Sequence, residues 1–269
     1  MPEPVRVVVQ GALGRVGREV VSALCNDPQT EPVGAVDLKA TEKQLALTDG
    51  HSGVIPLTSD LESMLNNTHP DVLVDFTLAQ AAMASIRTVV RHKVSLVIGT
   101  TGFSPADLDE IDKLTKDNGI GAVVAPNFAL GAVMMIHLAE LAAKFFEWAE
   151  IIELHHEQKA DAPSGTALST AKKLVESKGG PFSYAPAEKE TLANARGGQL
   201  DGVAVHSVRL PGLSAHQEVI FGAPGQTLSI RHDTIDRRCY MPGVLLAVKK
   251  VGELKGLTYG LDVLLGLKS

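Results

Sequence analysis

Cysteine is scarce in this sequence. Cys25 and Cys239 are the two cysteines among 269 residues, which is too few for a disulfide framework and gives no C-x-x-C or Cys/His zinc spacing. A low cysteine content suits a reducing cytosol, where disulfides rarely persist. The sequence therefore predicts a cytoplasmic protein.

Signals for export or membrane insertion are also missing. No run of about 18 apolar residues occurs, which a membrane-spanning helix would need. Residues 1–4 lead directly into a strand-like segment, without the charged and apolar regions of a signal peptide. We expect no membrane partner.

Basic residues are in the minority. Lys and Arg number 25 against 31 Asp and Glu, which gives a net charge of −6 and a pI of about 5.8. Proteins that bind nucleic acid usually carry a basic balance, so we expect no nucleic-acid partner. Acidic small molecules stay possible as substrates, because the local field of a site outweighs the net charge.

The first 125 residues alternate short apolar runs with helix-like stretches. The runs are nearly continuously apolar, which is typical of parallel strands covered on both faces. They comprise Val5–Val9, Val33–Val36, Ile55–Leu57, Val72–Val74, Val94–Ile98 and Gly121–Ala125. Helices are expected over 15–26, 60–65 and 79–92 and from Pro105, and a loop over 38–53. The fold class predicted is α/β, with a Rossmann-type doubly wound parallel sheet.

The pattern changes after Pro126. We expect helices over 130–146 and 166–177, strands over 148–155, 203–210, 217–221 and 228–232, and a long loop over 181–202. This order indicates a second α+β domain with an open mixed sheet. A final helix over 241–254 and a final strand over 257–265 close the chain. We predict a dinucleotide-binding domain of residues 1–126 plus 241–269, and a domain of residues 127–240 for substrate binding and oligomerisation.

A glycine-rich turn follows the first predicted strand. Gly11, Gly14 and Gly17 form G-x-x-G-x-x-G just before a helix. Such glycines let the backbone approach a pyrophosphate, which the N–H groups of the helix N-terminus then bind. The spacing departs from the commonest fingerprint, with Ala12 in the place of the second glycine. A tight turn that serves packing alone is the alternative interpretation.

Charged residues near this turn suggest further cofactor contacts. Asp37 ends the second strand, twenty residues after Gly17, where an acidic side chain accepts hydrogen bonds from the adenosine ribose. Lys39 is placed to meet a 2′-phosphate instead, and Arg15 is a possible phosphate partner. The sequence therefore leaves NADH and NADPH both open as cofactors.

Two more loops follow strands of the first domain. Phe76 and Thr77 come after the fourth strand, and the run Gly99-Thr100-Thr101-Gly102 comes after the fifth. Ligands of open parallel sheets bind beyond the carboxyl ends of the strands. We therefore predict that both loops contact the cofactor.

The segment 153–167 concentrates protonatable and anion-binding groups. His155, His156 and Lys159 lie within five positions, and Ser164-Gly165-Thr166 opens a helix that Asp161 is placed to cap. N–H groups at such a helix tip bind a carboxylate well, and a nearby lysine strengthens the interaction. A metal site is disfavoured, because neighbours on a strand point to opposite faces, and a hydrolase elbow G-x-S-x-G is missing. A structural histidine pair is the remaining alternative.

These segments resemble the dihydrodipicolinate reductase family. The resemblance is carried by Glu-Leu-His-His-Glu-Gln-Lys-Ala-Asp-Ala-Pro-Ser-Gly-Thr-Ala over 153–167, the glycine loop over 11–18, and the runs 99–102, 125–128 and 206–209. It covers nearly the whole chain. Ala129 departs from the family, which often has serine there, so a hydroxyl contact is absent.

The resemblance implies a function and a set of site residues. Members reduce the cyclic imine dicarboxylate 4-hydroxytetrahydrodipicolinate, or its dehydrated form, to tetrahydrodipicolinate in lysine and diaminopimelate synthesis. They use NADPH or NADH and usually form homotetramers through the sheets of the second domain. The expected cofactor-binding residues are Gly11, Ala12, Gly14, Arg15, Val16, Asp37, Lys39, Phe76, Thr77, Gly99, Thr100, Thr101, Pro126, Asn127 and Phe128.

Chemistry assigns roles in the second domain. Hydride addition to a conjugated imine leaves negative charge on the ring, so a proton donor is needed. We expect His155 to be the general acid, because histidine titrates near neutral pH, with Lys159 as the second catalytic residue. The residues expected to hold the substrate carboxylates are His156, Ser164, Gly165 and Thr166. No metal is expected, and hinges are expected near Asn127 and residues 238–241.

Two rival functions share part of this evidence. A dehydrogenase acting on aspartate or homoserine would have the first domain but not the segment 153–167. A non-catalytic dinucleotide sensor would keep the glycine loop and need no paired histidines.

Overall fold

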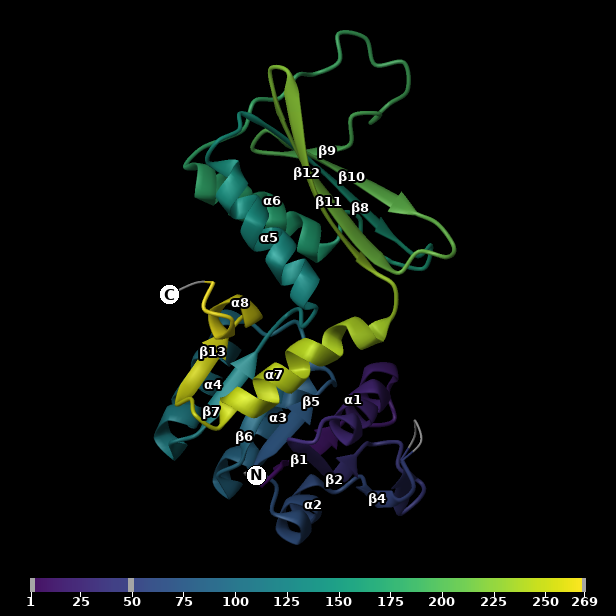
Figure 1. Cartoon of the computed structure of the whole chain (residues 1–269), viewed down its shortest axis with the longest axis vertical. Coiled ribbons are helices and arrows are strands. Elements are labelled where there is room, and N and C mark those ends of the chain that lie inside the picture. The colour runs from purple at the N-terminus through teal and green to yellow at the C-terminus, as the bar shows by residue number, and fades with distance from the viewer. Residues whose placement is uncertain (1–2, 48–50, 268–269) are drawn as a thin grey trace. The chain divides into compact units, whose positions relative to one another are not determined.

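The computed structural model describes residues 3–47 and 51–267 and divides into two compact units (Figure 1). Unit 1 runs to Leu130 and resumes at Arg237, and unit 2 is Gly131–Asp236. We predicted boundaries at 126/127 and 240/241. Phe128 and Ala129 are buried, at 2% and 1% exposure, so the first segment of unit 1 continues past the predicted boundary. The outermost residues of the predicted first domain, 1–2 and 268–269, and residues 48–50 of the predicted loop lie outside the described residues.

Unit 1 is built on a sheet with the strand order β13-β7-β6-β5-β1-β2-β4-β3. All its pairings are parallel except that of β3 with β4 at one edge. The strands are β1 (Val5–Gln10), β2 (Thr30–Val36), β3 (Gln44–Ala46), β4 (Val54–Thr58), β5 (Val72–Asp75), β6 (Ser95–Ile98), β7 (Gly121–Val124) and β13 (Gly256–Tyr259). The prediction of a doubly wound, mainly parallel sheet is confirmed.

Helices cover both faces of this sheet. The packing partners place α1 (Arg15–Asn26) and α7 (Met241–Val251) on one face, and α2 (Leu61–Thr68), α3 (Ala79–Val89) and α4 (Pro105–Asn118) on the other. Figure 1 shows the strands between these two layers. Every residue of β5, β6 and β7 is buried, which explains why their sequences are apolar without alternation. One short 3-10 helix, Val90–His92, follows α3.

Local sequence sets the start of α4. The Ser104 hydroxyl accepts a hydrogen bond from the Asp107 N–H at 3.2 Å, and the Asp107 carboxylate accepts from the Ser104 N–H at 2.8 Å. This reciprocal capping satisfies two donors that the first turn would leave unpaired. Pro105 follows as the first helical residue, as predicted.

Three short elements differ from the sequence prediction. β3 lies inside the predicted loop 38–53, and β9 (Gly198–Leu200) lies inside the predicted loop 181–202. Both are three-residue edge strands: β3 pairs with β4, and β9 pairs with β10, which begins at Val203 directly after the turn that follows β9. The strand predicted over 257–265 is wrong after Tyr259: Gly260 has φ of +97° and turns the chain into the short helix α8 (Leu261–Leu264).

Unit 2 has a mixed sheet with the order β12-β11-β8-β10-β9. Its central strand β8 (Trp148–His155) pairs in parallel with β10 (Val203–Arg209) and antiparallel with β11 (Ala215–Ala223), which pairs antiparallel with β12 (Gln226–Thr234). The prediction of an open mixed sheet is confirmed.

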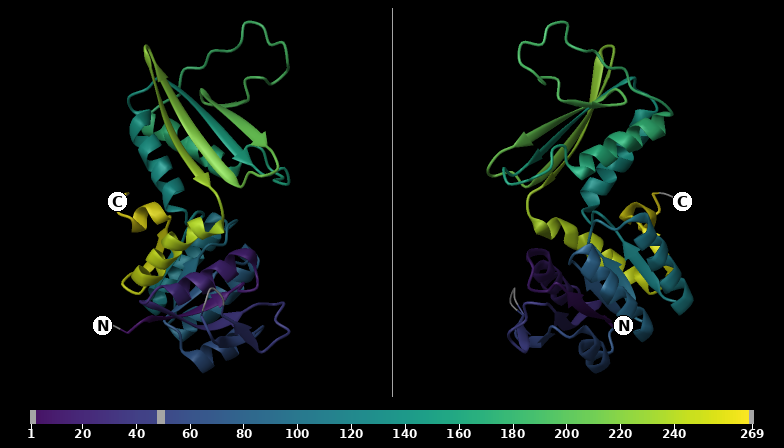
Figure 2. Two further views of the ribbon diagram at one scale, coloured as in Figure 1. Left: turned by 45° about the vertical axis from the view of Figure 1, so that its right-hand side comes forward. Right: turned by 180° about the vertical axis from the view of Figure 1, so that it is seen from behind.

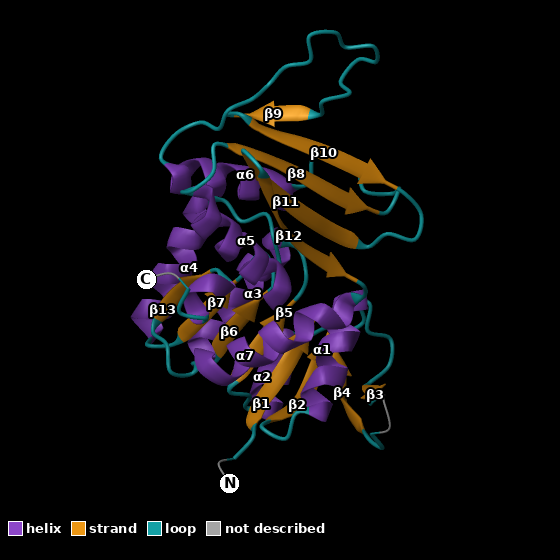
Figure 3. Ribbon diagram, turned by 45° about the horizontal axis from the view of Figure 1, so that its top comes forward, coloured by secondary structure: helices purple, strands orange, loops and turns teal. Residues whose placement is uncertain are grey.

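One face of the second sheet is covered by helices. The helices α5 (Leu130–Ala143) and α6 (Gly165–Lys178) lie on the same side of the strands (Figures 2 and 3). Their small residues Ala139, Ala143 and Ala167 pack with Ile151 and Phe221 of the sheet. Buried residues alternate with less buried ones along β8, as expected for a sheet with one covered face. The opposite face exposes 44% of Trp148.

Candidate active site

The glycine loop connects β1 to α1 at the carboxyl edge of the first sheet. Gly11 has φ of +76°, a conformation that favours glycine. A Cβ on Gly17 would lie 2.1 Å from the Gly11 carbonyl oxygen, so this position accepts no side chain without displacing the loop. Gly14 is the N-cap of α1 and is exposed, and the first turn of α1 has no acidic residue. The helix N-terminus is therefore available to an anion.

Asp37 ties the second strand to this loop. Its carboxylate accepts hydrogen bonds from the Leu13 N–H at 3.0 Å and the Lys39 N–H at 2.9 Å. Asp37 is half-buried and Lys39 is exposed. The carboxylate thus lies beside the glycine loop, where the sequence placed the ribose contact.

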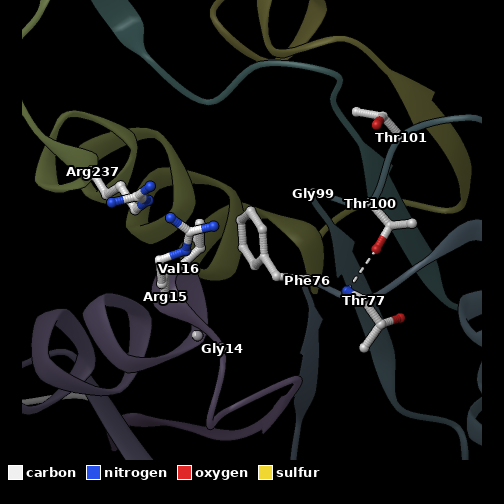
Figure 4. A pocket seen from close by; sticks show the side chains of 10 residues that line it. Gly14, Arg15, Val16, Phe76, Thr77, Gly99, Thr100, Thr101 and Arg237 are labelled. Atoms are coloured by element: carbon white, nitrogen blue, oxygen red, sulfur yellow. Dashed lines mark hydrogen bonds between the residues drawn. The ribbon is translucent and has the colours of Figure 1, made fainter. Parts of the chain in front are cut away.

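A cavity of about 350 Å³ lies at this edge of unit 1 (Figure 4). Four segments form it: the start of α1, the loop after β5, the loop after β6 and the segment that begins at Arg237. Its wall consists of Gly14, Arg15, Val16, Gly17, Phe76, Thr77, Gly99, Thr100, Thr101 and Arg237. This size suits part of a dinucleotide, because ligand pockets measure about 300–1,000 Å³.

The cavity brings together eight of the predicted cofactor residues, and the remaining seven lie off its wall. Those seven are Gly11, Ala12, Asp37, Lys39, Pro126, Asn127 and Phe128. Phe128 is only 2% exposed and packs against Phe76, with 5.9 Å between ring centroids. The Asn127 side chain accepts a hydrogen bond from the Ala129 N–H at 2.9 Å. Phe128 thus supports the cavity through its contact with Phe76.

Sequence reasoning missed Arg237 as a cavity residue. It opens the short 3-10 helix Arg237–Tyr240, which precedes α7. Arg15 and Arg237 are both exposed, and both carry their guanidinium groups toward the cavity (Figure 4). Two cations beside a helix N-terminus and an open glycine turn fit a pyrophosphate. The residues present therefore fit a dinucleotide.

In unit 2, the predicted catalytic segment is organised by Glu153. Its side chain has no exposed surface, although it is charged. Arg209 donates to both carboxylate oxygens, at 2.7 and 2.9 Å. The Ser164 N–H donates to Oε1 at 3.2 Å, and His155 Nδ1 lies 2.5 Å from Oε2. Burial raises the pKa of Glu153, but the bonds from Arg209, Ser207 and His155 outweigh burial and hold that pKa below its usual range.

This contact decides which ring nitrogen of His155 is available. The ionised carboxylate of Glu153 only accepts hydrogen bonds, so Nδ1 of His155 carries a hydrogen. Nε2 is then the nitrogen that can exchange a proton with a ligand. Burial lowers the pKa of His155, and repulsion from the charges of Lys159 and Arg209 lowers it further. The hydrogen bond to Glu153 and its negative charge raise the pKa, but each by less than burial lowers it. The pKa of His155 lies below its usual value as a result.

Lys159 lies close to His155 and is paired with Asp161. Its Nζ donates to the Asp161 carboxylate at 2.6 Å, with 22% of the Lys159 side chain exposed. This hydrogen bond is the main reason that the pKa of Asp161 is lowered, and the Gly165 N–H contributes as well. The lysine and the helix tip already hold one carboxylate, which shows that they can bind such a group.

The tip of α6 differs in two respects from the prediction. The helix is capped by Ser164, not by Asp161: the Ser164 hydroxyl accepts a hydrogen bond from the Ala167 N–H at 3.2 Å. The Ser164 N–H, one of the N–H groups predicted to bind a carboxylate ligand, is not free, because it donates to Glu153. Gly165 and Thr166 are exposed, and a Cβ on Gly165 would meet no atom within 4 Å. His156 is exposed in the turn after β8.

Sequence reasoning assigned no role to Glu153 or Arg209. Their 56-residue separation along the chain is bridged by the parallel pairing of β10 with β8, in which Arg209 is the register partner of His155. The signal for Glu153 was its place in β8 between Ile151 and His155: alternation puts it on the covered face with Ile151. A buried carboxylate needs a cationic partner.

Within the described ranges, no group of three or more His, Cys, Asp or Glu side chains is arranged to hold a metal ion. No described helix is long and apolar enough to cross a membrane.

Comparisons with known proteins agree with this geometry. The family model "Dihydrodipicolinate reductase, N-terminus" matches residues 5–128, and "Dihydrodipicolinate reductase, C-terminus" matches residues 131–265. A 4-hydroxy-tetrahydrodipicolinate reductase of Dehalococcoides mccartyi is 57% identical over 98% of this chain and 99% of its own length. The enzyme of the same name from Moorella thermoacetica is 52% identical over 97% of this chain and 98% of its own length.

Solved structures show the same similarity. A dipicolinate-bound dihydrodipicolinate reductase from Paenisporosarcina sp. TG-14 aligns with a TM-score of 0.86 and 41% identity, over 97% of this chain and 99% of that one. An amine dehydrogenase from Mycobacterium smegmatis aligns with a TM-score of 0.64 at 17% identity, a likeness of fold alone.

The doubly wound unit, its cofactor cavity and these relatives define an NAD(P)H-dependent oxidoreductase. The chain belongs to the dihydrodipicolinate reductase family.

Proposed function

We propose that this enzyme reduces 4-hydroxy-tetrahydrodipicolinate, or the imine formed from it by dehydration, to tetrahydrodipicolinate in lysine and diaminopimelate synthesis. The observation that carries the proposal is the cluster around Glu153. It brings His155, Lys159 and the tip of α6 together in one place. A proton donor beside carboxylate-binding groups is what reduction of a cyclic diacid requires.

The two units have different roles: unit 1 binds the cofactor, and unit 2 binds the substrate. The nicotinamide cofactor supplies the hydride, and unit 1 binds it through the cavity beside Arg15 and Thr77. In unit 2, Lys159 and the N–H groups of Gly165 and Thr166 bind the substrate carboxylates, in the way that Lys159 and Gly165 now hold Asp161. His156, exposed in the adjacent turn, and the Ser164 hydroxyl are the further proposed carboxylate contacts.

His155 supplies the proton. Glu153 holds Nδ1 and thereby points Nε2 away from the buried carboxylate. Nε2 of the protonated ring gives its proton to the negative charge that hydride addition leaves on the substrate ring. The charge that Lys159 contributes stabilises the same developing anion.

The preference between the cofactors rests on two residues. Asp37 offers carboxylate oxygens to the hydroxyls of an adenosine ribose, which favours NADH. Lys39 is exposed two residues further on and would pair with the 2′-phosphate of NADPH. We propose that both cofactors are used, and comparison of kcat/KM for each measures the balance.

An assay with freshly prepared substrate tests the proposal. Oxidation of NADPH or NADH must depend on the cyclic imine and yield tetrahydrodipicolinate by mass spectrometry. Oxidation with aspartate semialdehyde or homoserine-pathway substrates instead would indicate one of the other dehydrogenases. Cofactor binding without turnover of any of them would indicate a sensor.

We also propose a cytoplasmic homotetramer that forms through the sheet of unit 2. The support is the face of that sheet opposite α5 and α6, on which Trp148 is 44% exposed and β12 is exposed over most of its length. Sedimentation equilibrium is expected to give four chain masses, and a Trp148→Glu variant is expected to dissociate, because a buried charge without a partner opposes assembly. A monomeric wild-type enzyme would contradict this arrangement.

A further inference from the structure

A buried carboxyl group lies directly behind the cofactor cavity. Asp75 ends β5 and is 1% exposed. It lies behind the loops after β5 and β6, and it is absent from the cavity wall. The reaction as derived above gives this carboxyl no part, although burying one is costly unless hydrogen bonds compensate.

One oxygen of Asp75 collects three hydrogen bonds from the cavity wall. Oδ1 accepts from the Thr77 hydroxyl at 2.8 Å, the Thr77 N–H at 2.9 Å and the Thr100 hydroxyl at 2.8 Å. The Thr77 N–H also donates to the Thr100 hydroxyl oxygen, at 2.9 Å (Figure 4). Asp75 therefore connects the two loops that form this side of the cavity.

These bonds fix the direction of both hydroxyl hydrogens. The Thr100 hydrogen points to Asp75, and a lone pair of its oxygen already accepts from Thr77. The Thr77 hydrogen also points to Asp75, since the other acceptor in reach, the Leu78 carbonyl, lies at 3.5 Å. A hydroxyl has one hydrogen and two lone pairs. The Thr77 oxygen is therefore left with lone pairs only.

We propose that Asp75 is a positioning residue that makes Thr77 a hydrogen-bond acceptor for the nicotinamide riboside half of the cofactor. The donors on that half are the ribose hydroxyls and the carboxamide N–H₂, and both need an acceptor. This side of the cavity does not suit phosphate, because the Thr77 N–H is already used. The phosphates are expected at the start of α1, beside Arg15. The inference rests on the proposed binding of NAD(P)H in this cavity.

The second oxygen of Asp75 makes no hydrogen bond to the described residues. Oδ2 of Asp75 is buried without a hydrogen-bond partner in the described part of the chain, and the same holds for Oε1 of Gln10. Gln10 is the register partner of Asp75 in the parallel pair β1–β5, so both side chains leave the sheet on the same face. Burial raises the pKa of Asp75, against the effect of Thr100 and Thr77. Asparagine has the same shape as aspartate and would preserve the acceptor at Oδ1.

The test compares two ligands by isothermal titration calorimetry. NADH carries the nicotinamide riboside, and ADP carries the adenosine and both phosphates without it. Asp75→Ala is expected to weaken NADH binding by about tenfold, the effect of losing one well-placed hydrogen bond, and to change ADP binding by less than about twofold. Asp75→Asn is expected to restore most of the NADH affinity. A merely structural role would weaken both ligands together, and that result would overturn the inference.

Two further variants complete the experiment. Thr77→Val removes the acceptor itself and is expected to show the same selective loss for NADH, which keeps the inference testable if Asp75→Ala does not fold. Equal losses for NADH and ADP in Thr77→Val would refute it. Arg15→Ala, on the phosphate side, is expected to weaken both ligands. If Arg15→Ala changes neither, the placement of the cofactor is wrong, and that failure is distinct from failure of the role given to Asp75.

Discussion

Replacing His155 by alanine is expected to lower kcat by about 100-fold or more, because general acid–base groups contribute on that scale. Lys159→Ala is expected to cause a loss of similar size, with a raised KM in addition, since Lys159 binds a substrate carboxylate as well as stabilising charge. Steady-state rates with saturating cofactor measure both effects. Both variants are expected to retain the wild-type affinity for NADH, which unit 1 binds.

The pH profile separates a proton donor from a residue that only supports packing. The acid form of His155 is the active one, so kcat/KM is expected to fall as the pH rises through the pKa of the free enzyme. Burial and the neighbouring cations lower that pKa, so the midpoint lies below about 6.5. Lys159→Ala removes one source of repulsion and is expected to move the midpoint to higher pH.

Lys172→Ala is a matched control for Lys159→Ala, because Lys172 is an exposed lysine on α6 of the same unit. Its kcat, KM and pH midpoint are expected to equal those of the wild type. Near-normal turnover in both His155→Ala and Lys159→Ala, with folded proteins, would contradict the roles assigned to them.

Replacing Arg209 by methionine is expected to reduce the free energy of unfolding of unit 2 by about 3–5 kcal/mol, because it leaves a buried carboxylate without its cation. The Glu153 side chain has no exposed surface and depends on Arg209 at both oxygens. Arg209 also donates to the Asp161 carbonyl at 2.7 Å, so the loop that carries Lys159 loses a support. Urea denaturation followed by circular dichroism measures the stability, and kcat is expected to fall with it.

Arg231→Met is the matched control for this change. Arg231 pairs with Asp233 on β12, and its side chain is 45% exposed. Exposed pairs contribute about 0–1 kcal/mol, so the control is expected to stay within that range. The double variant Glu153→Gln with Arg209→Met is expected to recover part of the stability, because no unpaired buried charge remains. A loss below about 1 kcal/mol in Arg209→Met would contradict the role given to the buried pair.

Much of the fold could be predicted because its signals are local. The runs at 72–74 and 94–98 are apolar at every position, since β5 and β6 are buried on both faces. Ser104 and Pro105 mark the start of α4 through a cap that involves only its first turn. The short edge strands β3 and β9 escaped prediction, because three residues are too few to show a hydrophobic alternation.

The reactive residues proposed for the site could be named from the sequence, and their supports could not. His155, Lys159 and the helix tip at Gly165 lie close together in the sequence, so their spacing indicated a site for a carboxylate, and the dicarboxylate followed from the family resemblance. Arg209 reaches that site only through the pairing of β10 with β8.

The sequence by itself determined where the groups proposed for the chemistry lie: a glycine turn before a helix, and a histidine, a lysine and a helix tip within a dozen residues. These properties depend on neighbours along the chain, where covalent spacing limits the geometry. The tertiary structure alone decided that Glu153 pairs with Arg209, that Asp75 orients hydroxyls from two different loops, and that Arg237 returns to the cofactor cavity. Each of these depends on packing between segments distant in the sequence, and chain spacing does not restrict which distant groups meet.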